Sequence, residues 1–330
     1  MSNLPIIEAA KDELTAIFKD LHQHPEIGFT EHRTAGVVAK KLKEYGVDEV
    51  HTGIASTGVV GIIKGNEGSR RVGLRADMDA LPIDELTNLN YSSKTPGVMH
   101  ACGHDGHTTM LLGAAKHLAE TRDFTGTAVL IFQPAEEGLG GARGMISDGL
   151  FERFPCDEIY GMHNTPNGRP GTVGICKGTA MAGASFFDIT IQGKGSHAAM
   201  PHQSRDPLVI ASDLVGSIQT VLSRNVAPLE TCVLSVTQIH SGSAYNIVPD
   251  TATLAGTIRY FKQEVFDLAD SRMRELCSGF ATAYGVEITL DNRNTFDVLV
   301  NDEKLSEAYL EAAEDIVGKE NISGTQDPAT

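Results

Sequence analysis

Apolar residues recur at helical spacing in several stretches of the chain. In the first of these, residues 6–22, Ile6, Leu14, Ile17 and Leu21 fall on one side of a helix. The same spacing predicts further helices over residues 31–45, 107–120, 206–222, 264–284 and 305–317. Such amphipathic segments are packing elements, so the pattern indicates a globular protein rather than a fibrous or disordered one.

Between the first helices the period changes to that of β-strands. Residues 126–133 form a continuous apolar run, which is typical of a strand buried on both faces in a largely parallel sheet. Shorter stretches predict strands over residues 57–64, 71–77 and 158–162. We therefore expect an α/β fold, with a mixed, largely parallel sheet flanked by helices.

From about residue 180 the order of elements changes. Strands over 186–192, 231–240, 252–260 and 286–290 alternate with the helices over 206–222 and 264–284 in the order β-α-β-β-α-β. This order predicts a ferredoxin-like α+β domain. At 330 residues the chain is long enough for two domains. We expect a main domain formed by residues 1–179 and 294–330, with the smaller domain, residues 180–293, inserted into it.

Composition and charge indicate which partners and which cellular compartment suit the protein. The formal net charge is −16, which disfavours nucleic acid and anionic membrane surfaces as partners. The first residues lack a basic segment followed by an apolar one, and no apolar run approaches the ~20 residues of a membrane span. Five cysteines without disulfide-like spacing suit a reducing compartment, so we expect a cytoplasmic protein.

Reactive and ionisable side chains are most concentrated in residues 100–107, His-Ala-Cys-Gly-His-Asp-Gly-His. Imidazole, thiol and carboxylate side chains are all ligand types for zinc or a similar divalent ion. Gly103 and Gly106 allow a turn tight enough for Cys102 and His104 to converge on one point. For any single residue the alternative stays open, since a lone cysteine is usually a small core residue and most histidines have ordinary hydrogen bonds.

Further ligand types follow the ends of the predicted strands. The strand over 71–77 ends in Asp77-Met78-Asp79, the strand over 126–133 is followed by Glu136 and Glu137, and the strand over 158–162 is followed by His163. Adjacent carboxylates beside a buried strand are expensive to desolvate unless a cation neutralises them. A solvated acidic turn is the alternative for the two glutamates alone. Open α/β sheets bind ligands at this edge, so the shared position favours a metal site.

Four other segments carry polar side chains with less specific signals. His22 and His24 flank a turn before Pro25, and His197 lies in the glycine-rich segment 193–202. Asn246 and Arg259 add an amide and a guanidinium, and the latter is a fork-shaped donor for a carboxylate. Ordinary surface positions are the alternative for all of them.

Taken together, these stretches resemble the metal-dependent N-acyl-amino-acid amidohydrolases. This is the group of hippurate hydrolase and the plant auxin-conjugate hydrolases, within the co-catalytic metallopeptidase superfamily. The segments that carry the resemblance span nearly the whole chain: residues 22–28, 75–82, 100–107, 132–138, 161–163, 195–197 and 246–250. It implies hydrolysis of N-acyl-L-amino acids by a two-metal site in a larger catalytic domain, and a smaller lid domain that also forms a homodimer.

The resemblance also implies roles for individual residues. Cys102 corresponds to the ligand that bridges the two metals, His104 and His163 to the other ligands of one metal, and Glu137 to a ligand of the second. Zinc, manganese, cobalt and nickel all suit these ligands. Glu136 corresponds to the general base for the attacking water.

Other implied roles concern positioning and the substrate. Asp79 corresponds to the carboxylate that orients a ligand imidazole. His197 corresponds to a lid histidine that enters the neighbouring subunit's site and steadies the oxyanion. Asn246 and Arg259 correspond to substrate-binding residues, with Arg259 the candidate for the free carboxylate.

One feature departs from the family pattern. The family carries another metal-ligand histidine near the C-terminus, whereas no histidine follows His240 before the end at Gln326-Asp-Pro-Ala-Thr330. We therefore expect a truncated chain in which Cys102 and Glu137 alone hold the second metal. Two alternatives stay open: a dipeptidase or carboxypeptidase on the same site, and a non-catalytic metal-binding or dimerisation protein.

Overall fold

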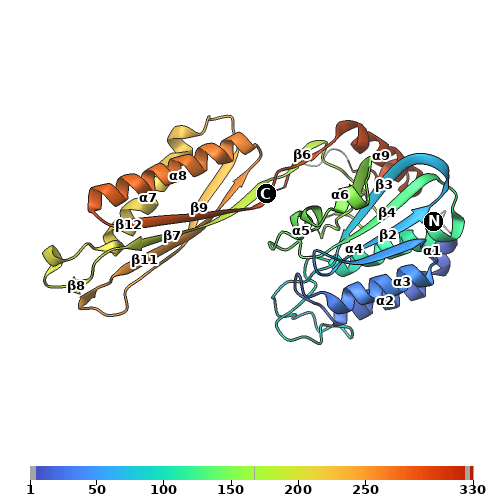
Figure 1. The fold of residues 1–330 in the computed structure, drawn as a ribbon, viewed down its shortest axis with the longest axis horizontal. Coiled ribbons are helices and arrows are strands. Elements are labelled where there is room, and N and C mark those ends of the chain that lie inside the picture. Colours follow the sequence, from blue (N-terminus) through green and yellow to red (C-terminus); the bar gives the residue numbers. More distant parts are fainter. Residues whose placement is uncertain (1–4, 167, 324–327, 330) are drawn as a thin grey trace. The chain divides into compact units, whose positions relative to one another are not determined.

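The computed structural model describes residues 5–166, 168–323 and 328–329, and the chain divides into two compact units, residues 1–172 and 173–330 (Figure 1). Each unit has its own hydrophobic core. Gln326, Asp327 and Thr330, at the end of the predicted third segment, lie outside the described residues. The predicted assignment of residues 1–179 and 294–330 to one domain stays a prediction.

The first unit is built on a five-stranded sheet in the order β1-β2-β4-β3-β5. β2 is antiparallel to both of its neighbours, whereas β3 pairs in parallel with β4 and β5. Four strands therefore run in one direction and β2 runs against them, which confirms the predicted mixed, largely parallel sheet. The strands are β1 (Glu49–Ile54), β2 (Gly58–Lys64), β3 (Asn66–Asp77), β4 (Thr125–Gln133) and β5 (Glu158–Gly161).

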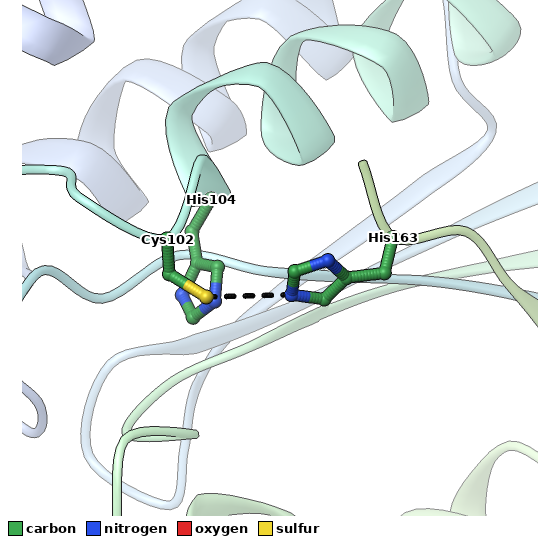
Figure 2. A group of neighbouring side chains, drawn as sticks. All are labelled: Cys102, His104 and His163. Carbon is green, nitrogen blue, oxygen red and sulfur yellow. Dashed lines mark hydrogen bonds between the residues drawn. The ribbon is translucent and has the colours of Figure 1, made fainter. Parts of the chain in front are cut away.

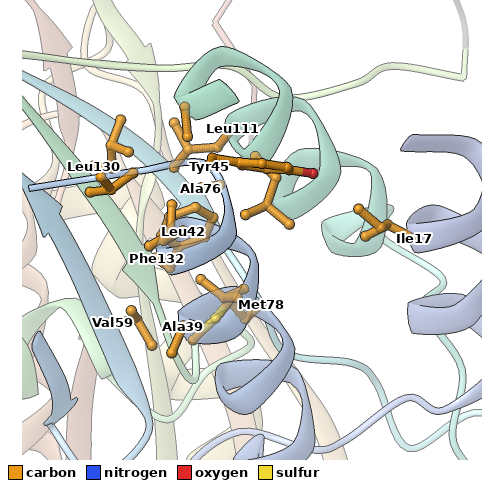
Figure 3. Close-up of a cluster of buried hydrophobic side chains, with 14 of the residues drawn as sticks. Ile17, Ala39, Leu42, Tyr45, Val59, Ala76, Met78, Leu111, Leu130 and Phe132 are labelled. Carbon is orange, nitrogen blue, oxygen red and sulfur yellow. The ribbon is translucent and has the colours of Figure 1, made fainter. Parts of the chain in front are cut away.

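Helices cover both faces of this sheet. Leu130 and Phe132 of β4 pack with residues of α2, α3 and α4 (Figure 3), while the alternate residues Val129 and Ile131 pack with α5 and α6. Successive side chains of a strand point to opposite faces, so β4 supplies both cores. After α1 (Pro5–Ala9), the helices are α2 (Lys11–Gln23), α3 (His32–Glu44), α4 (His104–Thr121), α5 (Gly141–Ser147) and α6 (Leu150–Arg153).

The second unit contains a four-stranded antiparallel sheet in the order β12-β7-β11-β9. Two helices, α7 and α8, pack their apolar residues against one face of it. This arrangement confirms the predicted ferredoxin-like order. Its elements are β7 (Gly183–Gln192), α7 (Pro207–Asn225), β9 (Cys232–Ser241), β11 (Thr251–Tyr260), α8 (Gln263–Tyr284) and β12 (Glu287–Phe296).

Smaller elements complete the second unit. Two short antiparallel pairs join β6 to β13 and β8 to β10. These elements are β6 (Gly178–Met181), β8 (Ser196–His197), η1 (Pro201–Gln203), β10 (Ile247–Val248), β13 (Leu299–Asn301), α9 (Glu303–Val317) and η2 (Lys319–Asn321). α9 confirms the helix predicted over residues 305–317.

Some elements differ from the prediction. The single helix expected over residues 6–22 is two helices, α1 and α2, with Ala10 between them. β1, α5 and α6 were not expected from the pattern, because glycines interrupt the apolar spacing in residues 138–149 and Gly53 interrupts β1. No helix in the described part of the chain combines the length and the apolar character that crossing a membrane requires.

Candidate metal centre

The parallel strands of the first unit bring three segments to one edge of the sheet. In the pairing of β3 with β4, Asp77 lies opposite Gln133, the last residue of β4. In the pairing of β3 with β5, Arg75 lies opposite Gly161, the last residue of β5. The residues that follow these strand ends, among them Asp79, Glu137 and His163, therefore start from neighbouring positions, as the sequence predicted.

A turn at Gly103 adds the fourth segment. Gly103 has φ +93°, and a Cβ at this position would lie 2.6 Å from the side-chain nitrogen of Asn164. Only glycine tolerates both the backbone conformation and the close approach. α4 begins directly afterwards at His104, so the turn brings Cys102 and His104 to the same side.

Cys102, His104 and His163 form one cluster (Figure 2). One ligand atom from each side chain lies within 4.8 Å of the others, and Cys102 Sγ is 3.4 Å from His163 Nε2. Zinc–sulfur and zinc–nitrogen bonds in a tetrahedral site would separate such atoms by about 3.5 Å. The spacing of the thiol and the imidazole therefore suits a shared divalent ion.

Hydrogen bonds orient both imidazoles of the cluster. His104 Nδ1 is 3.1 Å from Asp79 Oδ1, and His163 Nδ1 is 2.7 Å from the carbonyl oxygen of Asn164. Each Nδ1–H therefore donates to an oxygen, which leaves Nε2 of each ring as the potential ligand atom. The other carboxylate oxygen of Asp79 accepts a hydrogen bond from the backbone N–H of Glu137 at 2.9 Å. Asp79 therefore links His104 to the turn after β4 that carries Glu136 and Glu137, called the glutamate turn below.

Two buried polar atoms of the site lack hydrogen-bond partners among the described residues. They are Nε2 of His104 and Oε1 of Glu137, which lie 3.8 Å apart. Leaving buried polar atoms unpaired is costly, and native proteins rarely do so without a functional reason. Because imidazole nitrogen and carboxylate oxygen are both ligands for divalent metals, the donor set fits such an ion.

The electrostatics of the cluster favour positive charge. The neighbouring imidazoles of His104 and His163 lower the pKa of the Cys102 thiol. The hydrogen bond to Cys102 raises the pKa of His163 to about 9. Burial opposes a charge on His104, yet Asp79, Cys102 and Asp77 together raise the pKa of His104 to about 11. A divalent cation would take the place of the protons held here.

Glu136 lies beside this cluster in a different environment. Glu136, Glu137 and His104 each place a ligand atom within 4.8 Å of the others. Burial, followed by the negative charges of Glu137 and Asp77, raises the pKa of the Glu136 carboxyl. A half-buried carboxylate with a raised pKa is a suitable proton acceptor. Both glutamates follow the end of β4, and each brings a carboxylate oxygen close to His104.

A buried network that the sequence did not assign supports the centre. His107 Nδ1 is 2.6 Å from Asp77 Oδ1, and His107 Nε2 is 2.6 Å from Asn164 Oδ1. Burial opposes ionisation of Asp77, but the hydrogen bond from His107 and the charge of Arg75 hold the pKa of Asp77 well below its usual range. This network ties α4 to the ends of β3 and β5. Its sequence signal was the position of His107, one turn after the glycine.

The remaining predicted residues fall into two groups. His22 and His24 belong to the first unit but are engaged elsewhere: His22 lies 2.7 Å from Asp105, and His24 lies 2.8 Å from the carbonyl oxygen of Asp20. Both are hydrogen-bonded side chains, and neither belongs to a group of potential metal ligands among the described residues.

His197, Asn246 and Arg259 belong to the second unit. The pairing of β8 with β10 brings His197 and Asn246 together, because the N–H of Ala198 donates to the Asn246 carbonyl at 3.0 Å. Arg259 lies near the other end of β11, about 26 Å along the strand from Thr251. The structure therefore joins two of these three residues and separates the third from them.

Comparison with known proteins places these features in context. A family model described as peptidase family M20/M25/M40 matches residues 73–330. Hippurate hydrolase of Campylobacter jejuni is 42% identical over 328 residues, which cover 99% of this chain and 85% of the relative. N-acetyl-L-cysteine deacetylase of Bacillus subtilis is 40% identical, over 94% of this chain and 74% of the relative.

A solved structure is similar over the same extent. The crystal structure of the Bacillus subtilis YXEP protein, described as a dinuclear metal-binding peptidase of the M20 family, matches with a TM-score of 0.79 at 34% identity. The match covers 97% of this chain and 84% of the other. The likeness therefore extends across both units.

Proposed function

The chain belongs to peptidase family M20/M25/M40, and we propose from that membership that it is a metal-dependent amidohydrolase cleaving N-acyl-L-amino acids to a carboxylate and an amino acid. The observation that carries the proposal is the convergence of Cys102, His104 and His163 beside Glu137, whose Oε1 lies 3.8 Å from His104 Nε2. Its substrate class follows the hippurate hydrolase and N-acetyl-L-cysteine deacetylase relatives.

Cys102, His104 and His163 would hold one divalent ion, and Glu137 with the Cys102 thiolate would hold a second. When bound, such ions lower the pKa of water to about 7 and polarise the scissile carbonyl. Zinc, manganese, cobalt and nickel each suit this donor set. Asp79 orients His104 through the 3.1 Å hydrogen bond and fixes the ring nitrogen that is offered to the metal.

Glu136 is the general base in this proposal. Its raised pKa, caused first by burial, suits a carboxylate that takes a proton from the attacking water and returns it to the leaving amine nitrogen. The alternation between base and acid requires one residue placed beside both atoms. Glu136 lies next to Glu137 and close to His104, and this position supports the role.

His197 is assigned to the oxyanion. Its Nδ1 accepts a hydrogen bond from the N–H of Ala199 at 3.1 Å, so a neutral ring carries its proton on Nε2. A donor of this kind contributes about 3–4 kcal/mol to stabilising an oxyanion. We assign Asn246, which lies beside it, to binding the substrate, and Arg259 to the free carboxylate.

We further propose that the chain acts as a cytoplasmic homodimer. The ferredoxin-like domain would form the interface, so that His197 serves the site of the neighbouring subunit. The exposure of His197 supports this assignment. The five cysteines, all free thiols, are compatible with a reducing compartment.

The test is a substrate panel on metal-reconstituted protein. N-acetyl and N-benzoyl amino acids are compared with free dipeptides, for the wild type, Glu136→Gln and the exposed control Glu152→Gln. We expect release of amino acids from the N-acyl substrates, a loss of about 10²–10⁴-fold in Glu136→Gln, and no change in the control.

Two results would overturn the proposal. Faster hydrolysis of free dipeptides than of N-acyl amino acids would assign a dipeptidase or carboxypeptidase. One bound ion per chain without turnover of any substrate would assign a non-catalytic metal-binding protein. A further result, equal rates for the wild type and Glu136→Gln, would exclude Glu136 as the general base.

A further inference from the structure

Glu31 is a buried carboxyl group that lies outside the proposed mechanism. Glu31, directly before α3, is 0% exposed, and it does not cap its own helix with its side chain. Instead, its two carboxylate oxygens accept hydrogen bonds from Thr57 Oγ1 at 2.6 Å and from the backbone N–H of Ala135 at 2.7 Å. Because a buried carboxyl is costly, this position calls for a physical reason.

The partner of Glu31 is an unusual residue. Ala135 has φ +51°, a left-handed conformation that residues with a Cβ rarely adopt, and it directly precedes Glu136. Its carbonyl oxygen accepts a hydrogen bond from Gly141 at 2.9 Å, so both polar groups of its backbone are held. Strained backbone of this kind persists only where the surroundings impose it, and it concentrates at functional sites.

The segment that ends at Glu31 also touches the other side of the site. The backbone N–H of Ala80, next to Asp79, donates to the Glu26 carbonyl at 2.9 Å. A Cβ on Gly28 would lie 2.8 Å from the Cα of Ala135, so the two backbones are in close contact. Residues 26–31 therefore brace both the Asp79 end of β3 and the turn after β4.

We propose that Glu31 is a positioning residue for the glutamate turn. Its carboxylate holds Ala135 in the left-handed conformation and so sets the direction in which Glu136 and Glu137 leave β4. The inference rests on the proposed function for the role of Glu136, but its effect on Glu137 concerns metal binding alone. Misplacement of a catalytic group by about 1 Å can cost on the order of 10²-fold in rate.

Glycine provides a specific test, since it adopts the left-handed conformation without steric cost. If Glu31 acts by holding Ala135, then Ala135→Gly should reduce the dependence on Glu31. If Glu31 served only the stability of α3, adding Ala135→Gly to a Glu31 variant would not restore activity. The conservative variant Glu31→Gln keeps one oxygen for the Ala135 N–H, and its amide can donate to Thr57 Oγ1.

The experiment compares the wild-type chain with Glu31→Ala, Glu31→Gln, Ala135→Gly and the double variant Glu31→Ala/Ala135→Gly. The readouts are kcat and KM for an N-acyl amino acid, zinc affinity by chelator competition, and the thermal midpoint. In Glu31→Ala we expect kcat to fall by about 10- to 100-fold with KM within about twofold, together with weaker zinc binding. Glu31→Gln and Ala135→Gly should stay near wild type, and the double variant should recover most of the lost kcat and zinc affinity.

Unchanged kcat and zinc affinity in folded Glu31→Ala would overturn the proposal, as would a loss that Ala135→Gly does not relieve. If Glu31→Ala does not fold, Glu31→Asp takes its place, because its shorter side chain cannot reach both partners and the same loss and rescue are expected. If no protein hydrolyses the substrate while zinc affinity follows the expected order, the proposed function fails and the positioning role stands.

Discussion

Asp79 and His104 meet through a hydrogen bond of 3.1 Å between Oδ1 and Nδ1, and both side chains are buried. The second oxygen of Asp79 accepts from the backbone N–H of Glu137 at 2.9 Å. One carboxylate thus orients an imidazole from α4 and fixes the turn after β4. This geometry makes Asp79 the link between the ligands proposed for the two metals.

Asp79→Asn should therefore weaken metal binding. Asparagine has one side-chain oxygen, so it can accept from His104 or from Glu137, but its amide would face the other donor. Loss of such an outer partner typically costs about 10- to 100-fold in metal affinity or activity, and we expect a change of that size. Zinc affinity is measured by competition with a chelator. The exposed Asp123→Asn serves as the control, and equal affinities in the two variants would argue against the orienting role.

The Cys102 thiolate should dominate the stability gained from metal. An ion present at about 100 times its dissociation constant stabilises the folded state by about 2.7 kcal/mol per site. Cys102→Ser replaces a soft thiolate with a poor zinc ligand, so we expect it to lose most of this gain. The measurement is the unfolding midpoint with zinc and with chelator, for the wild type, Cys102→Ser and the control Cys232→Ser. A zinc-induced shift of wild-type size in Cys102→Ser would exclude the thiolate as a ligand.

Much of this site was predictable because the information is local. Cys102 and His104 are two residues apart around Gly103, and Asp79, Glu137 and His163 each follow a strand whose direction the pattern indicated. Parallel strands bring such ends to one edge of a sheet, so their convergence follows from the topology. Local information also sets the start of α7, where the Asp206 side chain accepts a hydrogen bond from the N–H of Leu208 at 2.9 Å.

Long-range packing explains what the sequence did not reveal. The contact of Glu31 with Ala135 joins residues that are 104 positions apart, and the sequence around either residue does not predict it. α5 was missed because its first residue is Gly141, where a Cβ would lie 1.7 Å from the Pro134 carbonyl oxygen. The packing requires a glycine at this position, and a glycine weakens the sequence signal for a helix.

The core of the first unit makes a prediction about stability. Leu42 of α3 is 0% exposed and packs with Val59 and Phe132 in the larger cluster (Figure 3). Leu42→Ala should lower the free energy of unfolding by about 2–5 kcal/mol, since it loses buried apolar surface and leaves a cavity. Leu86, which is 84% exposed, provides the matched control Leu86→Ala, for which we expect little change. Chemical denaturation measures both, and similar losses would mean that Leu42 is not in the core.

The final prediction concerns pH and the buried pair of His22 with Asp105. The 2.7 Å hydrogen bond to Asp105 raises the pKa of His22 above its ordinary value of 6.5, burial opposes the shift, and Glu85 at 3.3 Å adds to it. A raised folded-state pKa means that the folded protein binds the proton more tightly than the unfolded chain. The stabilisation from His22 is then fully present below about pH 6.5, and it is lost as the pH rises through the raised folded-state pKa.

His22→Gln removes the charge, so its deficit in the unfolding midpoint relative to wild type should be largest near pH 6 and should shrink towards pH 9. Both proteins carry the same potential metal ligands, and in the same metal buffer the titration of those ligands cancels in the difference. His240→Gln, at an exposed position of β9, controls for the loss of an imidazole as such. If the deficit of His22→Gln in the unfolding midpoint grows with pH, then the neutral ring of His22 stabilises the fold. That result would contradict a stabilising charged pair of His22 with Asp105.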